Sequence, residues 1–133
     1  MTLVVDSSAV VAALADGGSF GAWAAAELES EDLAAPHPMP VEVANILRRA
    51  VLAGDLSADS AVLAHDDLVQ LPVELFPYEL HARRVWELRE NLTAYDAWYV
   101  ALAESLDAPL VTLDHRLARA TGPRCQFRLP PRR

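Results

Sequence analysis

Four acidic residues stand at positions where the sequence could bind a metal ion. Asp6 and Asp114 each end a short apolar run that is typical of a buried strand, whereas Glu42 and Asp96 each fall in the first turn of an expected helix. Ligands of open α/β sheets bind beyond the carboxyl ends of the strands, so folding could bring these four carboxylates together. Carboxylates at this density repel one another unless protons or cations intervene.

Hard oxygen ligands of this kind suit Mg²⁺, with Mn²⁺ as a possible substitute. One or two such ions could orient and deprotonate a water molecule and stabilise the charge that builds on a phosphodiester in the transition state. The pattern therefore favours metal-assisted hydrolysis, for which neither a cysteine nucleophile nor a phosphate-binding glycine loop is needed. The four histidines show no metal-ligand spacing.

Each acid also has a purely structural interpretation. Asp6 and Asp114 could simply cap the helices that follow them. Glu42 could complement a helix dipole, and Asp96 could form a capping box with Thr93. Taken singly, none of the four acids distinguishes between the two interpretations; their combination and the surrounding sequence favour a functional site.

The elements that must position these acids alternate along the chain. Apolar runs predict strands at 3–5, 33–35, 72–76, 109–113 and 125–129, the last at a sheet edge. Periodicity and capping signals predict helices at 9–15, with Ser7 and Ser8 as caps, and at 20–31, 40–52, 58–69, 78–89, 94–106 and 115–120. Strands separated by helices imply an α/β fold, a central and mostly parallel β-sheet flanked by α-helices on both faces. The helix at 94–106 is apolar around most of its circumference and is expected to be central.

The bulk properties suit one globular domain. The 133 residues predict a single domain over 1–129 and a short, flexible C-terminal tail over 130–133. Cys125 is the only cysteine, so an internal disulfide and a cysteine-rich zinc site are excluded. The sequence has no apolar run of about 18 residues and a poor signal peptide, so we expect no membrane association and a cytoplasmic protein.

The net charge of −8 is unexpected for a protein that binds nucleic acid, which normally carries a basic face. All 11 basic residues are arginines, and Arg116 is the best candidate to hold an RNA phosphate, although a solvated arginine is an equally good interpretation. The three tryptophans are expected in core or interface packing rather than in base stacking. The acidic balance also suits a basic protein partner.

Four segments of the sequence stand out, at residues 4–9, 40–45, 91–104 and 110–118. Together they resemble the PIN-domain ribonucleases, and in particular the VapC-type toxins of bacterial VapBC type II toxin–antitoxin systems. They cover nearly the whole chain in the expected order. The more specific segments are Asn91-Leu92-Thr93-Ala94-Tyr95-Asp96-Ala97-Trp98-Tyr99-Val100-Ala101-Leu102-Ala103-Glu104 and Leu110-Val111-Thr112-Leu113-Asp114-His115-Arg116-Leu117-Ala118. The others are Val4-Val5-Asp6-Ser7-Ser8-Ala9 and Pro40-Val41-Glu42-Val43-Ala44-Asn45.

This resemblance implies a PIN-like fold and a Mg²⁺-dependent endoribonuclease that acts as a toxin. It implies an acidic catalytic site made by Asp6, Glu42, Asp96 and Asp114. Asp6 and Asp96 would be the main metal ligands, Asp114 would complete or support the site, and Glu42 would hold a water or a second metal.

Hydroxyl groups and protein partners also follow from the resemblance. Ser8 and Thr112 would be hydrogen-bond partners that support the acids. The family further implies a homodimer and a cognate VapB-type antitoxin that occludes the cleft and inhibits the enzyme.

Other functional classes fit less well. A phospho-receiver signalling domain also has acids at strand ends in an α/β fold, but its chemistry normally uses a lysine, and this chain contains none. A haloacid-dehalogenase-type phosphatase would need Asp-x-Asp after the first strand and a lysine later in the chain, whereas Asp6 is followed by Ser7-Ser8. A PIN-domain RNA-processing nuclease without a toxin role stays open as an alternative, and intact acids argue against a fold retained only for partner binding.

Overall fold

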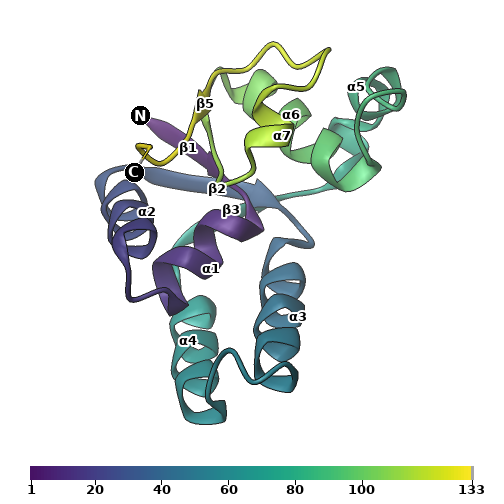
Figure 1. The fold of residues 1–133 in the computed structure, drawn as a ribbon. Coiled ribbons are helices and arrows are strands. Elements are labelled where there is room, and N and C mark those ends of the chain that lie inside the picture. The colour runs from purple at the N-terminus through teal and green to yellow at the C-terminus, as the bar shows by residue number, and fades with distance from the viewer. Residues whose placement is uncertain (133) are drawn as a thin grey trace.

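The computed structural model describes residues 1–132 and shows a five-stranded, all-parallel sheet with helices on both faces (Figure 1). The strand order across the sheet is β3-β2-β1-β4-β5, which places β1 at the centre. The strands are β1 (Thr2–Val5), β2 (Asp32–Pro36), β3 (Val73–Phe76), β4 (Leu110–Val111) and β5 (Phe127–Arg128). The predicted fold class is confirmed.

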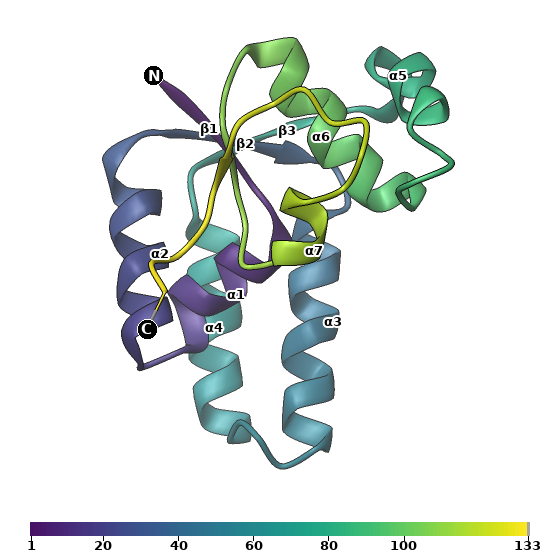
Figure 2. The same ribbon diagram turned by 45° about the horizontal axis from the view of Figure 1, so that its top comes forward.

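The helices divide between the two faces of the sheet, as Figures 1 and 2 show together. Helices α1 to α4 gather on one side, and α6 packs against β1, β2 and β4 on the other side with α5 beside it. The helices of residues 1–132 are α1 (Ser7–Ala15), α2 (Ser19–Ser30), α3 (Met39–Leu52), α4 (Ala58–Gln70), α5 (Ala82–Glu87), α6 (Ala94–Leu106) and α7 (His115–Ala118), with a 3₁₀ turn, η1 (Tyr78–Leu80).

The central strands form the middle of the core. Val4 and Val5 of β1 pair with Leu110 and Val111 of β4, and all four side chains are fully buried. A strand that is covered on both faces needs apolar side chains in both directions, which explains the unbroken apolar runs. This pairing also brings the carboxyl ends of β1 and β4 side by side, where the chain carries Asp6 and Asp114.

Helix α6 is the central helix that its apolar circumference predicts. The Thr93 hydroxyl caps it by accepting a hydrogen bond from the Asp96 N–H, and Asp107 ends it in the left-handed region at φ 50°. Its buried residues include Ala97, Tyr99 and Val100. Because α6 begins beside the carboxyl ends of the strands, its first turn carries Asp96 to the same edge as Asp6.

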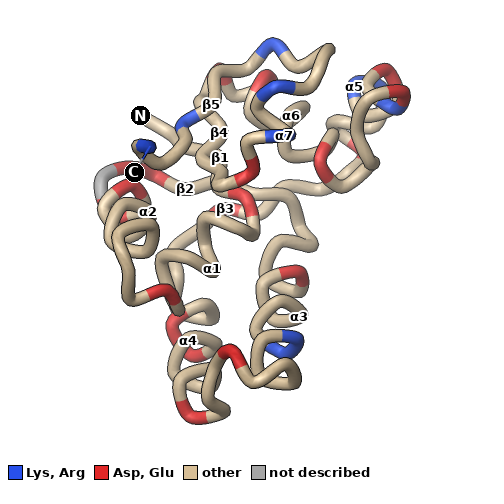
Figure 3. Tube along the Cα trace, in the orientation of Figure 1, with Lys and Arg blue, Asp and Glu red and all other residues tan. Residues whose placement is uncertain are grey.

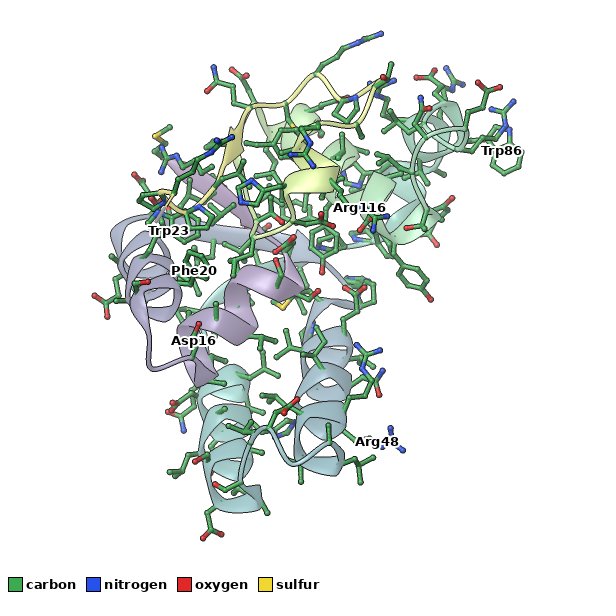
Figure 4. All side chains as sticks on the ribbon, viewed as in Figure 1. Asp16, Phe20, Trp23, Arg48, Trp86 and Arg116 are labelled. Carbon is green, nitrogen blue, oxygen red and sulfur yellow. The ribbon has the colours of Figure 1, made fainter. Side chains whose placement is uncertain are left out.

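The prediction of one continuous helix over 78–89 is wrong. The chain forms η1, breaks at His81 and resumes as α5, because His81 is buried and Tyr78 packs edge-on against Trp98 with ring centroids 5.2 Å apart. Leu80, at the end of η1, is 70% exposed. Trp86 is also outside the core; it points away from the body of the molecule with the Arg89 guanidinium 4.8 Å from its ring (Figure 4).

Smaller differences lie at the element ends. The first helix is capped by Asp6, not by the predicted Ser7 and Ser8, because the Asp6 carboxylate accepts the hydrogen bond of the Ala9 N–H. Strand β4 stops at Val111, earlier than predicted, and the Leu113 N–H donates to the Ser8 hydroxyl instead of to a strand. Helix α3 begins at Met39, one residue before the predicted start. The predicted tail over 130–133 ends in a residue outside the described range.

Among residues 1–132, no single helix is long and apolar enough to cross a membrane, although α1 and α2 pass that test together as a pair bent by 110°.

Candidate metal and active site

Asp6 is the most enclosed of the four predicted acids. It follows β1 directly, and the residue is only 7% exposed. Its Oδ1 atom accepts hydrogen bonds from the Ser8 hydroxyl at 2.7 Å and from the Ala9 N–H at 2.9 Å, and its Oδ2 atom accepts one from the Thr112 hydroxyl. These three donors fix the orientation of the carboxylate, so Asp6 both caps α1 and points into the site.

The two hydroxyls predicted to support the site also join β1 to the segment that follows β4. Ser8 Oγ accepts the Leu113 N–H at 3.1 Å, and Thr112 Oγ1 accepts the Asp114 N–H at 3.0 Å. Thr112 is fully buried. A deletion of either hydroxyl therefore removes a donor from Asp6 and a partner from the chain that leads to Asp114.

Glu42 lies in the first turn of α3 and is held by a residue of α6. The Tyr99 hydroxyl donates to Glu42 Oε1 at 2.5 Å, and the Tyr99 residue is 3% exposed. Within residues 1–132 the second carboxylate oxygen of Glu42, Oε2, accepts no hydrogen bond, so it is available to a ligand or a water.

Asp96 and Asp114 line one pocket of about 350 Å³ together with Arg116. Asp96 is half-buried in the first turn of α6, whereas Asp114 is exposed and caps the short helix α7 through its Oδ1 atom, which accepts the N–H groups of Arg116 and Leu117. Figure 3 shows acidic positions where β1 runs into α1 and where β4 runs into α7, with a basic position beside them on α7. Asp114 therefore caps α7 and also lines the same pocket as Asp96.

The carboxylates influence one another electrostatically. Burial is the main cause that raises the pKa of Asp6, Glu42 and Asp96 above the ordinary values of such groups. The negative charge of Asp96 further raises the pKa of Asp6 and of Glu42, and the charge of Asp114 raises that of Asp96. Coulombic coupling of this kind requires the groups to lie near one another, so the structure brings all four predicted acids into one neighbourhood.

The donor set suits a hard divalent cation, because all of its ligating atoms are carboxylate oxygens and a cation would offset their mutual repulsion. In the described part of the chain, however, no three acidic, histidine or cysteine side chains converge closely enough to hold one ion as they stand. The charge of Asp96 acts on Asp6, as it also acts on Glu42, so Asp96 is electrostatically coupled to both of these acids. Their role as metal ligands stays a prediction.

A larger pocket lies elsewhere in the described part of the chain. It has a volume of about 620 Å³ and its lining includes Met1, Glu104, Pro109 and Cys125, which places it at the amino ends of β1 and β4. Burial raises the pKa of the Cys125 thiol to about 11, so this cysteine is a weak nucleophile. The acids, which gather at the opposite ends of these strands, form the better candidate site despite their smaller pocket.

Tyr99 is the site residue that the sequence did not single out. It sits three residues after Asp96, which puts both on one face of α6. A buried tyrosine needs a partner for its hydroxyl, so a tyrosine within an otherwise apolar helix was an available signal. Its partner, Glu42, is 57 residues away in the sequence, and no local pattern identifies that pairing.

Comparison with known proteins places the chain in a family. The sequence model of the PIN domain matches residues 3–123. Ribonuclease VapC1 of Mycobacterium tuberculosis is 44% identical over 130 residues, which cover 95% of this chain and 96% of that protein. Among solved structures, PAE2754 from Pyrobaculum aerophilum superposes with a TM-score of 0.69 at 24% identity, covering 96% of this chain and 83% of that one.

A further structural neighbour is a complex. VapBC2 from Rickettsia felis, solved with a DNA fragment from its promoter, gives a TM-score of 0.65 at 13% identity and covers 97% of this chain and 98% of that chain. At such low identity the solved structures support the fold, and the family assignment rests on the sequence matches. With nearly its full length matched and its five parallel strands in place, the chain belongs to the PIN-domain family, within its VapC group.

Proposed function

We propose that this protein is a Mg²⁺-dependent endoribonuclease that acts as the toxin of a toxin–antitoxin pair. The observation that carries the proposal is the set of three carboxyl groups, Asp6, Glu42 and Asp96, whose pKa values are raised by burial and by the charge of at least one other acid of the site. A relative that matches 95% of the chain at 44% identity is named a ribonuclease, which supports RNA as the substrate.

Each acid takes a distinct role in this proposal. Asp6, fixed by three hydrogen bonds, and Asp96, from the first turn of α6, would hold Mg²⁺, and Asp114 would support the site from the start of α7. Mg²⁺ held by Asp6 and Asp96 would lower the pKa of a coordinated water and would offset negative charge on the scissile phosphodiester. Glu42 would hold a water through its free Oε2 atom, and its raised pKa suits a group that accepts a proton from that water.

The test is cleavage of RNA by the purified protein. Wild-type protein should cut single-stranded RNA with Mg²⁺ and should stop when EDTA is added, whereas Asp6→Asn and Asp96→Asn should lose at least about 100-fold in rate. Asp67→Asn is the matched control, because Asp67 is an exposed carboxylate on α4. Cleavage that survives EDTA would overturn the metal mechanism, and full activity of Asp96→Asn would overturn the role of that residue.

The toxin role and the partner form the second part of the proposal. A cognate VapB-type antitoxin with a basic segment would complement the net charge of −8 and inhibit the enzyme by covering the acids, and the toxin would act as a homodimer. Induced expression should arrest growth, and coexpression of the small DNA-binding protein encoded beside this gene should restore it. Cleavage without growth arrest would instead support an RNA-processing nuclease. Sedimentation of the purified protein tests the dimer.

A further inference from the structure

The pocket that Asp96 and Asp114 help to line combines negative, positive and neutral polar groups. Asp96 and Asp114 form one part of its lining, and Arg116 adds the single positive charge found in that lining among the described residues. Its volume of about 350 Å³ lies within the range of about 300–1,000 Å³ that is usual for small-molecule sites. The pocket is therefore large enough for one nucleotide unit of a longer chain.

Arg116 has no protein partner that would occupy it. Arg84 forms a bidentate ion pair with Glu104, and Arg128 pairs with Glu27. By contrast, within residues 1–132 the Arg116 guanidinium makes neither an ion pair nor a hydrogen bond. Figure 4 shows it on α7, on the side of the molecule where β1 and β4 end. Arg116 and Asp96 line the same pocket, so the two residues lie near each other.

An unpaired guanidinium at this position reduces the electrostatic repulsion between the acidic site and a phosphodiester substrate. A phosphodiester that approaches four carboxylates is repelled by them, and the protein as a whole carries a net charge of −8. A guanidinium can hold two phosphate oxygens through its planar, forked donors. Arg116 can therefore offset the repulsion for a phosphate that lies next to the reacting one.

The remaining lining of the pocket fits the sugar and base of the same nucleotide. Asn91, Thr93 and Thr121 supply an amide and two hydroxyls, which can hydrogen-bond a ribose hydroxyl or a base edge. Leu92, which is partly exposed, supplies apolar surface. Single-stranded RNA is recognised by this combination of phosphate contacts, hydrogen bonds and apolar contacts with exposed bases.

We propose that this pocket is a nucleotide subsite, in which Arg116 binds the backbone phosphate adjacent to the scissile linkage of single-stranded RNA. The proposal rests on the proposed ribonuclease function and adds the residue that positions the substrate. Arg116 acts by binding, so its removal weakens the complex for every RNA sequence to the same extent.

Three variants test the subsite. Arg116→Ala removes the guanidinium and Arg116→Lys keeps the charge without the fork. The matched control is Arg119→Ala, since Arg119 is an exposed arginine at the end of the same helix and outside the pocket lining. Binding of a labelled random-sequence single-stranded RNA of 20 nucleotides is measured by fluorescence anisotropy in EDTA. The background is Asp6→Asn, which abolishes cleavage without altering the pocket lining.

The subsite predicts a large and specific loss. Arg116→Ala should raise Kd about 10-fold and reduce the slope of log Kd against log salt concentration by about 0.7, the value for one phosphate contact on a single strand. Arg119→Ala should change Kd less than about 2-fold, and Arg116→Lys should fall between them. In the active protein, Arg116→Ala should raise KM by a similar factor with kcat nearly unchanged.

Two results would overturn the subsite. One is equal Kd values and salt slopes for Arg116→Ala and Arg119→Ala in proteins with the same melting temperature. The other is a fall in kcat for Arg116→Ala at constant KM, which would assign the guanidinium to the transition state. The binding measurement needs neither metal nor cleavage. An inactive wild-type protein would therefore contradict the ribonuclease function, while the anisotropy data would still decide the subsite.

Discussion

The Tyr99 hydroxyl donates to Glu42 Oε1 at 2.5 Å and so ties the middle of α6 to the first turn of α3. Helix α6 packs against one face of the sheet, and α3 packs with α1 and α4 on the other side. The hydrogen bond therefore joins the two sides at the edge where the acids gather. Because Oε1 is occupied, Glu42 presents Oε2 in a fixed direction. Tyr99 is therefore a positioning residue for Glu42.

Substitution of Tyr99 by phenylalanine should separate positioning from folding. We expect the free energy of unfolding to fall by about 1 kcal/mol, the usual contribution of one hydrogen bond, because the ring still fills its site. The rate of RNA cleavage should fall by about 10-fold with KM unchanged, since Glu42 loses its orientation. Tyr95→Phe is the control, because Tyr95 is 60% exposed on the same helix. Equal rates for the two variants would remove the positioning role.

Neutralisation of Asp96 should stabilise the metal-free protein. Its pKa is raised in the folded state, so the folded chain favours the protonated, neutral form, and ionisation at neutral pH costs stability. Asp96→Asn should raise the free energy of unfolding by about 0.5–1 kcal/mol, a modest value because the half-exposed carboxyl is screened by solvent. Thermal melts in EDTA check this.

The same melts with Mg²⁺ provide the internal control for that variant. A ligand that binds the folded state alone raises the melting temperature, so wild type should gain from Mg²⁺ and Asp96→Asn should gain less. A variant that melts below wild type in EDTA would show that Asp96 stabilises the fold in its charged form.

When the pH is lowered, the affinity for Mg²⁺ should begin to fall at a higher pH than it would at a site made of carboxylates with ordinary pKa values. The raised pKa values of Asp6, Glu42 and Asp96 mean that protons compete with the cation above the usual value of about 4. In the metal-free protein these groups contribute stability that is fully present below their unfolded pKa values and is lost as pH rises through the folded ones. Calorimetric titration with Mg²⁺ from pH 7.5 to pH 5 tests the competition, and an affinity that is constant over this range would contradict it.

The ion pair between Arg84 and Glu104 should contribute strongly to stability. Arg84 donates to both carboxylate oxygens at 2.7 and 3.1 Å and to the Gly122 carbonyl, so it joins α5, α6 and the loop before β5. Both side chains are about one-fifth exposed or less, at 21% and 16%. Arg84→Met should lower the free energy of unfolding by about 2–3 kcal/mol, because the Glu104 charge loses its partner.

The controls for this pair are a neighbouring arginine and a double variant. Arg83→Ala removes an exposed charge one residue away and should cost less than about 0.5 kcal/mol. Arg84→Met combined with Glu104→Gln should cost less than the sum of the two single changes, since the second change removes a charge that is already unpaired. Additive costs in urea melts would show that the pair is not coupled.

Local patterns in the sequence were enough to predict the strands, most helices and the edge of the sheet where the acids gather. Val5 followed by Asp6 indicated a buried strand that ends in a polar residue, and α6 had a clear cap and an apolar circumference. The break at His81 was not predictable in this way, because it depends on the packing of Tyr78 against Trp98, 20 residues later in the chain.

The candidate site could be predicted in its acids and in the hydroxyls of Ser8 and Thr112 that support them, but not in the contacts of Tyr99 and Arg116. The four carboxylates followed from strand and helix ends and from the resemblance to a family. The contact of Tyr99 with Glu42 and the unpaired state of Arg116 depend on which helices pack together across the sheet. Such pairings arise from the three-dimensional arrangement and leave no periodic signal in one sequence.

The hydrogen bond between Asp6 and Thr112 has a consequence for biosynthesis, because its partners are 106 residues apart in the sequence. The central strand β1 is translated before β4, so it acquires this neighbour only after the more than 100 intervening residues have been made. Parallel pairings over such separations form late in folding, after the cost of closing a long loop. A polypeptide that stops before Thr112 therefore lacks this donor to Asp6, so the enclosure of the carboxylate cannot be complete until the β4 segment has been made.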